Sequence, residues 1–491
     1  MSGRRTRVAV VATVTGCLLA ACTGTVDGTG ATAHRPAANP TSAATPGPRS
    51  SPTVPGSSRS SGRSDASVCP ARYAAPDPDR PRIALAFTIA PGHATVRGVE
   101  QVGFRPDRPV TELVFRLTAN TRPSVEQGNG IRVTSATATP AGGRYRFSAA
   151  NAAPSTQGGL LRIPLGRTVA AGQIATARIA FTLTLGENSF DRFGRAGRFA
   201  YFGSAQPLLA WERGYGWHTE DLIDFTAESA TSEAADTDLR VTAPAADVVI
   251  ASGNPADPAR AGSSRTWTSH LAAARDVSVA AGPFVVSDTR VGATALRLGA
   301  PSAQVRDALV PEFRRAIREL ARRFGPFPFP SLAVARLPAR GGGIEYPGSI
   351  LMLDGSRLVA VHETAHQWFY AMVGDSQSRH PWLDEAFANY AEELVDDVPA
   401  HSADLDAPGA VDSSTQSYGS DERGYYFTTY DKGSAALEQA RRAAGPTKWD
   451  AALRCYVARN AWRIVNPADF RAAIAHLPAG IAVLRKAGAL R

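Results

Sequence analysis

The stretch VHETAHQWFYAMVGDSQSRHPWLDEAFANY, residues 361–390, constrains the fold more than any other part of the sequence. His362 and His366 are four residues apart, so on a helix they lie on one face about one turn apart. Two imidazoles at that spacing can bind one metal ion. Apolar residues on either side of the pair support a helix: Leu358, Val359, Val361, Ala365, Phe369 and Met372. We therefore predict a helix over 358–372.

A hydrolytic zinc site needs three protein ligands and one open position, so a third ligand must come from another element. Gly374 and Pro381 interrupt the chain and allow it to reverse direction. A second helix is predicted to begin near Trp382, with Glu385 in its first turn. The predicted ligands of one zinc ion per chain are His362, His366 and Glu385.

Glu363 follows the first histidine directly, so it points to a neighbouring part of the helix surface rather than to the same ion. There it is placed to take a proton from a water molecule at the metal. The alternative is a surface helix that carries two histidines and binds no ion.

Residues from about 70 to 290 read as a succession of short strands bounded by Pro and Gly. In 177–185, ARIAFTLTL, apolar side chains alternate with Arg178, Thr182 and Thr184, which indicates a half-buried strand. Further strands are expected at 83–89, 94–104, 111–117, 159–165, 238–252 and 276–288. This pattern predicts an antiparallel β-sandwich or saddle domain over 69–298.

The pattern changes near residue 301. Ser302 is a suitable N-cap for a helix whose apolar residues recur at helical spacing, and GPFPFP ends that helix. A strand at 332–337 and a Gly-rich turn follow, and from Leu358 onward the sequence is mostly helical. We predict an α+β protein whose second domain, 299–491, carries the metal site.

The N-terminus indicates export. Arg4, Arg5 and Arg7 precede an apolar run that ends at Ala21, and this run is shorter than the about 20 residues that span a bilayer. The run ends in LAAC, which resembles the bacterial lipoprotein lipobox. Residues 1–21 are thus expected to be a lipoprotein signal peptide, with Cys22 lipidated at the outer face of the bacterial cell membrane. The alternative is an ordinary signal peptide followed by a chance cysteine.

Residues 22–68 consist mainly of Ser, Thr, Pro, Gly and Ala, which cannot bury enough apolar surface to fold, so a disordered linker is expected. After processing, Cys69 and Cys455 remain. In an exported protein they can form a disulfide, or both can stay free thiols.

The formal net charge of +9 does not indicate a nucleic-acid partner. Only three of the 53 basic residues are lysine, and the arginines are spread along the chain instead of gathering in one patch.

HETAHQW together with WLDEAFANY resembles the aminopeptidase N family of zinc metallopeptidases, the gluzincins. GGGIEYPG is similar to that family's exopeptidase motif, with Ile344 and Tyr346 where the motif has Met and Asn, and TTYDKG is similar to its Tyr-x-Lys-Gly element. The resemblance implies an N-terminal sheet domain and a thermolysin-like, mostly helical catalytic domain. It also implies a member without the large C-terminal helical domain of many relatives, and therefore with an open cleft.

The resemblance also implies roles for individual residues. His362, His366 and Glu385 would bind zinc, and Glu363 would be the general base and later the proton donor. Tyr430 would stabilise the oxyanion. Glu345 would bind the free α-amino group of a peptide, and Gly342 and Gly343 would let the substrate backbone approach.

The function expected from the sequence is that of an exported, membrane-tethered zinc metallopeptidase, an aminopeptidase that removes N-terminal residues from peptides. One alternative is a zinc endopeptidase with an open cleft, and another is a non-catalytic envelope lipoprotein that uses the β domain for binding. The sequence leaves open the preferred N-terminal residue and the oligomeric state.

Overall fold

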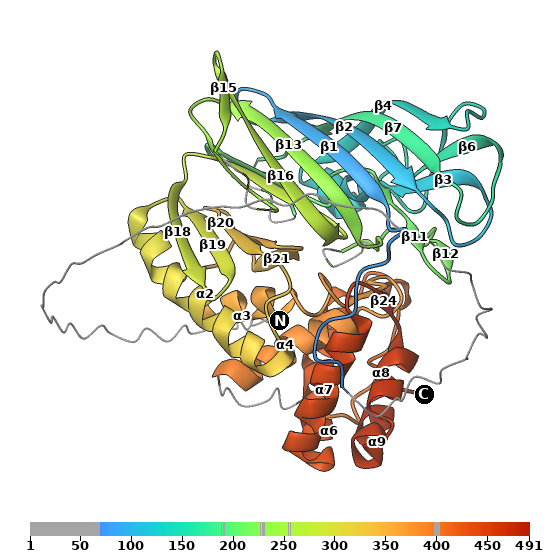
Figure 1. Ribbon diagram of the computed structural model, residues 1–491, viewed down its shortest axis with the longest axis vertical. Helices are drawn as coiled ribbons and strands as arrows, with labels where there is room; N and C mark the ends of the chain where they lie inside the picture. Colours follow the sequence, from blue (N-terminus) through green and yellow to red (C-terminus); the bar gives the residue numbers. More distant parts are fainter. Residues whose placement is uncertain are drawn as a thin grey trace, which may run out of the picture. The chain divides into compact units, whose positions relative to one another are not determined.

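Figure 1 shows the computed structural model, which describes residues 69–491 apart from 188, 190–191, 226, 228–230, 254, 256 and 397–402. The expected signal peptide (1–21), the lipidated Cys22 and the linker (22–68) lie outside the described residues. Residues 66–491 make up one compact unit. No helix within the described ranges combines the length and the apolar character that crossing a membrane requires.

The largest element of the N-terminal part is a seven-stranded sheet (Figure 1). The apolar positions of the predicted strand at 177–185 are buried and the positions between them are exposed or half-buried, as alternation requires. Neighbouring strands are antiparallel except β1 and β13, which are parallel. The order is β15 (Ala259–Ala261), β16 (Ser264–Ala274), β13 (Ala235–Pro244), β1 (Arg82–Ile89), β2 (Thr95–Phe104), β7 (Ala175–Thr184) and β4 (Gly130–Thr139).

Two four-stranded sheets share a hydrophobic core with the seven-stranded sheet, in which the ring of Phe87 packs edge-on against Phe181 and Phe202. One has the order β10 (Leu208–Leu209), β3 (Val110–Arg116), β6 (Leu160–Val169), β5 (Arg146–Ser148). The other has the order β14 (Val248–Ala251), β17 (Ser278–Gly282), β9 (Phe199–Gly203), β8 (Phe193–Ala196). A short hairpin, β11 (Trp211–Glu212) and β12 (Gly216–Trp217), and helix α1 (Arg122–Glu126) complete this part.

A five-stranded mixed sheet follows, covered by the long helix α2 (Ala303–Phe324) (Figure 1). The predicted cap is confirmed, since the Ser302 side chain accepts a hydrogen bond from the backbone of Val305 at 3.3 Å. The strand order is β18 (Val285–Val291), β19 (Thr294–Ala300), β20 (Ser331–Arg336), β22 (Ser349–Met352) and β21 (Gly343–Tyr346). This sheet begins at Val285, so it uses residues on both sides of the domain boundary predicted at 298/299.

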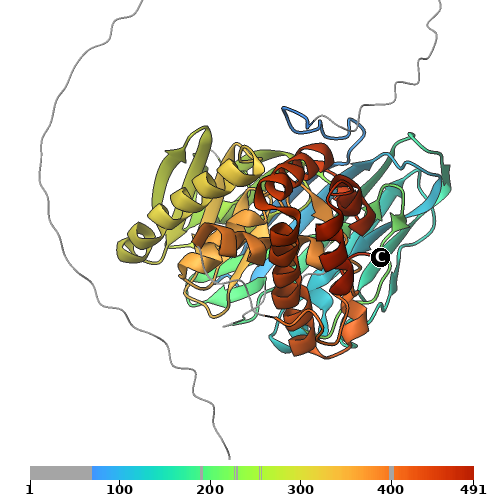
Figure 2. The same cartoon turned by 90° about the horizontal axis from the view of Figure 1, so that it is seen from below.

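The rest of the chain is mostly helical, as predicted, and Figure 2 shows the last helices gathered side by side. They enclose a second core that contains Trp382, Trp449, Tyr456 and Phe470. The helices are α3 (Arg357–Ala365), α4 (Trp382–Asp396), α5 (Glu422–Tyr426), a π-helix (Phe427–Lys432), α6 (Gly433–Ala444), α7 (Pro446–Asn460), α8 (Pro467–Ala473) and α9 (Pro478–Lys486), with strands β23 (Gly374–Asp375) and β24 (Ile464–Val465) between them. The predicted α+β class, with sheets first and helices after, is confirmed.

The helix predicted over 358–372 is wrong in its second half. It ends at Ala365, and His366 is its C-cap. Tyr370 has a φ of 97°, which a right-handed helix excludes, and its backbone N–H donates to Val373 at 2.8 Å. The apolar residues beyond Ala365, such as Phe369 and Met372, are buried, but they lie in turns and not on the face of a helix.

The structure joins Cys69 and Cys455 in a disulfide with their Cα atoms 5.0 Å apart. The bond ties the start of the described chain to helix α7. Beside it, the backbone N–H of Ala74 donates to Ala458 at 2.8 Å.

Candidate metal centre and active site

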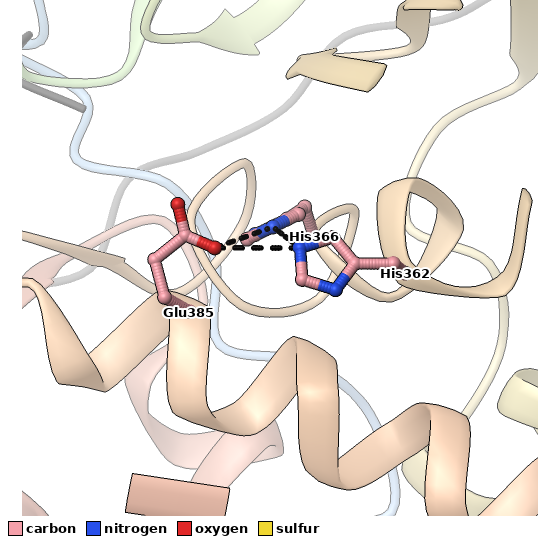
Figure 3. Close-up of side chains that lie close together, drawn as sticks. All are labelled: His362, His366 and Glu385. Atoms are coloured by element: carbon pink, nitrogen blue, oxygen red, sulfur yellow. Dashed lines mark hydrogen bonds and ion pairs between the residues drawn. The ribbon is translucent and has the colours of Figure 1, made fainter. Parts of the chain in front are cut away.

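Three side chains from α3 and α4 converge in one place (Figure 3). Nε2 of His362 lies 3.1 Å from Nε2 of His366, and each of these nitrogens lies 3.3 Å from Oε2 of Glu385. A tetrahedral zinc ion with bonds of about 2.0–2.1 Å holds its ligand atoms about 3.3 Å apart. The three ligand atoms therefore fit one zinc ion, and the structure brings together the ligands predicted from the sequence.

Each histidine is oriented through its other ring nitrogen. Nδ1 of His366 lies 3.2 Å from the carbonyl oxygen of Phe369, which the turn after α3 places there. Nδ1 of His362 lies 2.7 Å from Oε1 of Glu392. Such partners fix the tautomer that leaves Nε2 free for a metal. Glu392 was not predicted from the sequence, although its position two turns after Glu385 on the same helix could have revealed it.

Glu385 is held by the start of α4. Its backbone N–H donates to Oδ1 of Asp384 at 2.7 Å and to the carbonyl oxygen of Pro381 at 3.3 Å. Oδ2 of Asp384 in turn accepts a hydrogen bond from Gln377 at 3.2 Å. Gln377 lies in the segment between Gly374 and Pro381 that was predicted to reverse the chain. The reversal therefore also supplies hydrogen bonds that fix the third ligand.

The electrostatics of the cluster suit a cation. Burial alone would raise the pKa of Glu385, but the charges and hydrogen bonds of His366 and His362 lower it well below its ordinary value. Burial would lower the pKa of His362, but the hydrogen bonds that its ring makes to the carboxylates of Glu385 and Glu392 raise it well above its ordinary value. The metal-free site thus attracts positive charge, and a bound cation takes the place of a proton.

Glu363 and Glu345 lie next to this cluster. One carboxylate oxygen of each and one ring nitrogen of His366 lie within 4.8 Å of one another. Both glutamates are buried, Glu345 on strand β21 and Glu363 on α3. The base and the amine-binding carboxylate predicted from the sequence are therefore neighbours in one site.

The glycines before Glu345 have different surroundings. A Cβ on Gly343 would lie 2.4 Å from Cγ of Glu363, so this position must be glycine for Glu363 to lie where it does. A Cβ on Gly342 would meet no atom within 4 Å, so this position borders open space. Tyr346, which departs from the family motif, is fully buried against Gly203 of β9 and does not line the cleft.

Tyr430 lies on the π-helix, a distortion that often occurs at functional sites. Its ring is parallel to that of His362, with an interplanar angle of 5° and centroids 6.2 Å apart. Lys432 fixes this segment, because its Nζ donates to the carbonyl oxygens of Ala407 and Gly409 at 2.6 Å each. Tyr425, another tyrosine close by in the chain, is buried and packs on Phe225 with ring centroids 5.1 Å apart, so its role is packing.

One cavity of about 400 Å³ is lined by His362, His366, Glu385, Glu363, Glu345, Glu392, Gly342, Gly343 and Tyr430. Besides the predicted residues, its wall includes Arg192 and Ala227 from the N-terminal β part and Glu422 and Tyr426 from α5. Arg192, Ala227 and Glu422 were not predicted, because no local motif marks residues that reach a site from distant segments.

Residues 353–485 match the model of the Peptidase family M1 domain. Leucine aminopeptidase 2 of Phaeosphaeria nodorum is 25% identical over 160 residues, which is 27% of this chain and 26% of that protein. The match thus spans about a quarter of this curated relative's length.

Solved structures share the fold over most of the chain. The M1 zinc metallopeptidase of Deinococcus radiodurans has a TM-score of 0.60 at 21% identity, covering 84% of this chain and 93% of that one. A mutant of a two-domain M1 zinc metallopeptidase, bound to L-arginine, has a TM-score of 0.62 at 21% identity, covering 83% and 93%. Residues 353–485 are thus similar to the Peptidase family M1 domain, and the fold over most of the chain is that of these M1 zinc metallopeptidases.

Proposed function

We propose that the chain is an aminopeptidase that removes N-terminal residues from peptides. The observation that carries this is the position of Glu345, whose carboxylate lies beside Glu363 and the zinc ligand His366. A carboxylate fixed next to these two side chains pairs with the α-ammonium of a peptide and places the first peptide bond at the reacting groups.

The chemistry divides among the residues of the cleft. When bound, zinc supplies Lewis acidity, which acidifies water and polarises a carbonyl group. Glu363 takes a proton from the attacking water and passes it to the leaving amine. Tyr430 donates its phenolic hydrogen to the oxyanion that develops at the scissile carbon. Glu345 holds the ammonium, and the open space at Gly342 accommodates the substrate backbone.

The solved neighbours support this proposal. The structures are named as bound to L-arginine, to L-tryptophan and to the peptide Tyr-Ser-Ala, so related folds hold free amino acids and short peptides.

N-acetylation of the substrate tests the proposal. A peptide with a free amine should lose residues one at a time from its N-terminus, and the acetylated peptide should stay intact. Glu345→Gln should raise KM for the free peptide strongly and should not reduce the zinc content. Equal cleavage of free and blocked peptides, at internal bonds, would instead establish an endopeptidase.

We also propose that the chain is exported and anchored by a lipid on Cys22. The N-terminal sequence supports this, and so does the disulfide between Cys69 and Cys455, which suits an oxidising compartment. Mass spectrometry of the mature N-terminus should find a diacylglyceryl modification on Cys22, absent from Cys22→Ala. An unmodified mature protein that starts at another residue would contradict the anchor.

A further inference from the structure

Helix α5 contributes an acidic and an aromatic side chain to the wall of the cleft. Glu422 and Tyr426 are four residues apart on this helix, so they lie on the same side of it. Both are exposed, with 39% of the surface of Tyr426 accessible. Neither takes part in the chemistry described above.

The helix that carries this pair is fixed in place. Asp421 caps it by accepting a hydrogen bond from the backbone of Gly424 at 3.0 Å. The buried Tyr425 anchors the other side against Phe225. The ring of Tyr426 lies 5.0 Å from the ring of Tyr430, at 45°. The pair is therefore held at a set position next to the reacting groups.

One carboxylate of the cavity wall has no role in the chemistry described above. Among the described residues, five glutamates line the cavity. Glu385 binds the metal, Glu363 moves protons, Glu345 holds the α-ammonium, and Glu392 lies 2.7 Å from Nδ1 of His362. Glu422 has no ion-pair partner anywhere in the described part of the chain.

Positive charge is scarce on the cavity wall. Arg192, the one arginine that the described residues contribute to this wall, is buried, with 6% of its surface accessible, and its Nη2 lies 3.3 Å from the carbonyl oxygen of Ala227. A second positive group can therefore enter the cleft beside the α-ammonium and meet a carboxylate that is available for it.

We propose that Glu422 and Tyr426 bind the cationic side chain of a substrate's N-terminal residue, so that the enzyme prefers N-terminal arginine, and next lysine. This inference rests on the proposed aminopeptidase function. A guanidinium group can stack on the exposed ring of Tyr426 and donate two hydrogen bonds to the carboxylate of Glu422. Lysine can make the ionic contact but stacks less well, because its ammonium group is compact and strongly hydrated.

The test compares fluorogenic amides of arginine, lysine, leucine and glutamate. The wild-type enzyme should give the highest kcat/KM with arginine. Glu422→Gln should lower the ratio of kcat/KM for arginine to that for leucine about tenfold, the size of one charge-assisted contact. Tyr426→Leu should lower kcat/KM more for arginine than for lysine. The matched control is Glu126→Gln, an exposed glutamate of α1 that does not line the cleft, and it should leave the ratio unchanged.

Two further measurements separate this inference from the proposed function. Hydrolysis of the dipeptides Arg-Leu and Leu-Arg shows whether Glu422 and Tyr426 recognise the first or the second residue of the substrate. An effect of Glu422→Gln on Leu-Arg alone would overturn the inference. Calorimetry of the zinc-loaded enzyme with free L-arginine and L-leucine requires no turnover. If arginine binds more tightly than leucine, and Glu422→Gln abolishes this difference, the inference is supported. It is supported even if the enzyme hydrolyses none of the amides, because that result would refute only the aminopeptidase function. Equal binding of both amino acids would overturn the inference.

Discussion

Gly343 and Glu363 lie so close that a single methyl group between them would not fit. A Cβ at position 343 would stand 2.4 Å from Cγ and 2.5 Å from Cδ of Glu363. Strand β21 therefore places Gly343 against Glu363, the proposed general base, and Glu345, two residues further along the strand, lines the same cleft. One short strand thus positions both the proposed base and the proposed amine-binding group.

Replacing this glycine should impair catalysis without removing the metal. Gly343→Ala displaces the Glu363 carboxylate, and a displacement near 1 Å can reduce the rate on the order of 100-fold. Gly342→Ala is the matched comparison, since its methyl group meets no atom within 4 Å, and it should reduce kcat/KM less than Gly343→Ala does. Zinc content should stay the same in both. Wild-type activity in Gly343→Ala would show that this contact does not position the base.

Tyr430→Phe should remove one hydrogen-bond donor to the oxyanion. Loss of such a donor lowers kcat about 10²–10³-fold and leaves KM little changed. Tyr425→Phe is the control, because Tyr425 is buried in packing contacts. A fall in kcat for Tyr425→Phe, with none for Tyr430→Phe, would exchange the roles of the two tyrosines.

Glu100→Gln should stabilise the protein at neutral pH. Glu100 of β2 is fully buried, and its burial and the nearby Asp276 raise its pKa well above the ordinary value of 4.5. A carboxyl group with a raised pKa in the folded state favours folding most below pH 4.5, and this contribution is lost as the pH rises toward the folded-state pKa. Tm at pH 7 should therefore be a few degrees higher in Glu100→Gln than in the wild type, and the two should converge near pH 4. A lower Tm at pH 7 would contradict this account.

Breaking the disulfide should lower the stability of the folded chain. Cys69 and Cys455 are 386 residues apart, so the bond restricts the unfolded chain strongly. Its loss typically costs about 2–5 kcal/mol. The double variant Cys69→Ser/Cys455→Ser should show a lower Tm than the wild type in oxidising buffer and the same Tm as the reduced wild type. Free thiols in the wild type purified under oxidising conditions would contradict the bridge.

The sequence was sufficient for the parts of the site that depend on local spacing. One helical turn is enough to bring His362 and His366 together, and a reversal of the chain at Gly374 and Pro381 is enough to bring Glu385 to them. The strand alternation at 177–185 and the Ser302 cap are likewise local patterns, and the structure agrees with both.

What the sequence did not reveal depends on contacts between distant segments. Arg192 and Glu422 reach the same cleft from positions 230 residues apart, which no motif encodes. The end of α3 at Ala365 was missed because buried turns carry the same apolar residues as a buried helix. The role of Gly343 in admitting Glu363 also became visible only when β21 and α3 were placed together.

The central claim is that His362, His366 and Glu385 bind one zinc ion, and metal titration tests it most directly. Chelator-treated protein should take up one zinc ion per chain, as measured by calorimetry and by elemental analysis after dialysis. Glu363→Gln should bind the ion as the wild type does and be inactive, and Glu385→Gln should lose most of its affinity. Wild-type protein that takes up no zinc, or Glu385→Gln that binds it as tightly as the wild type, would contradict the claim.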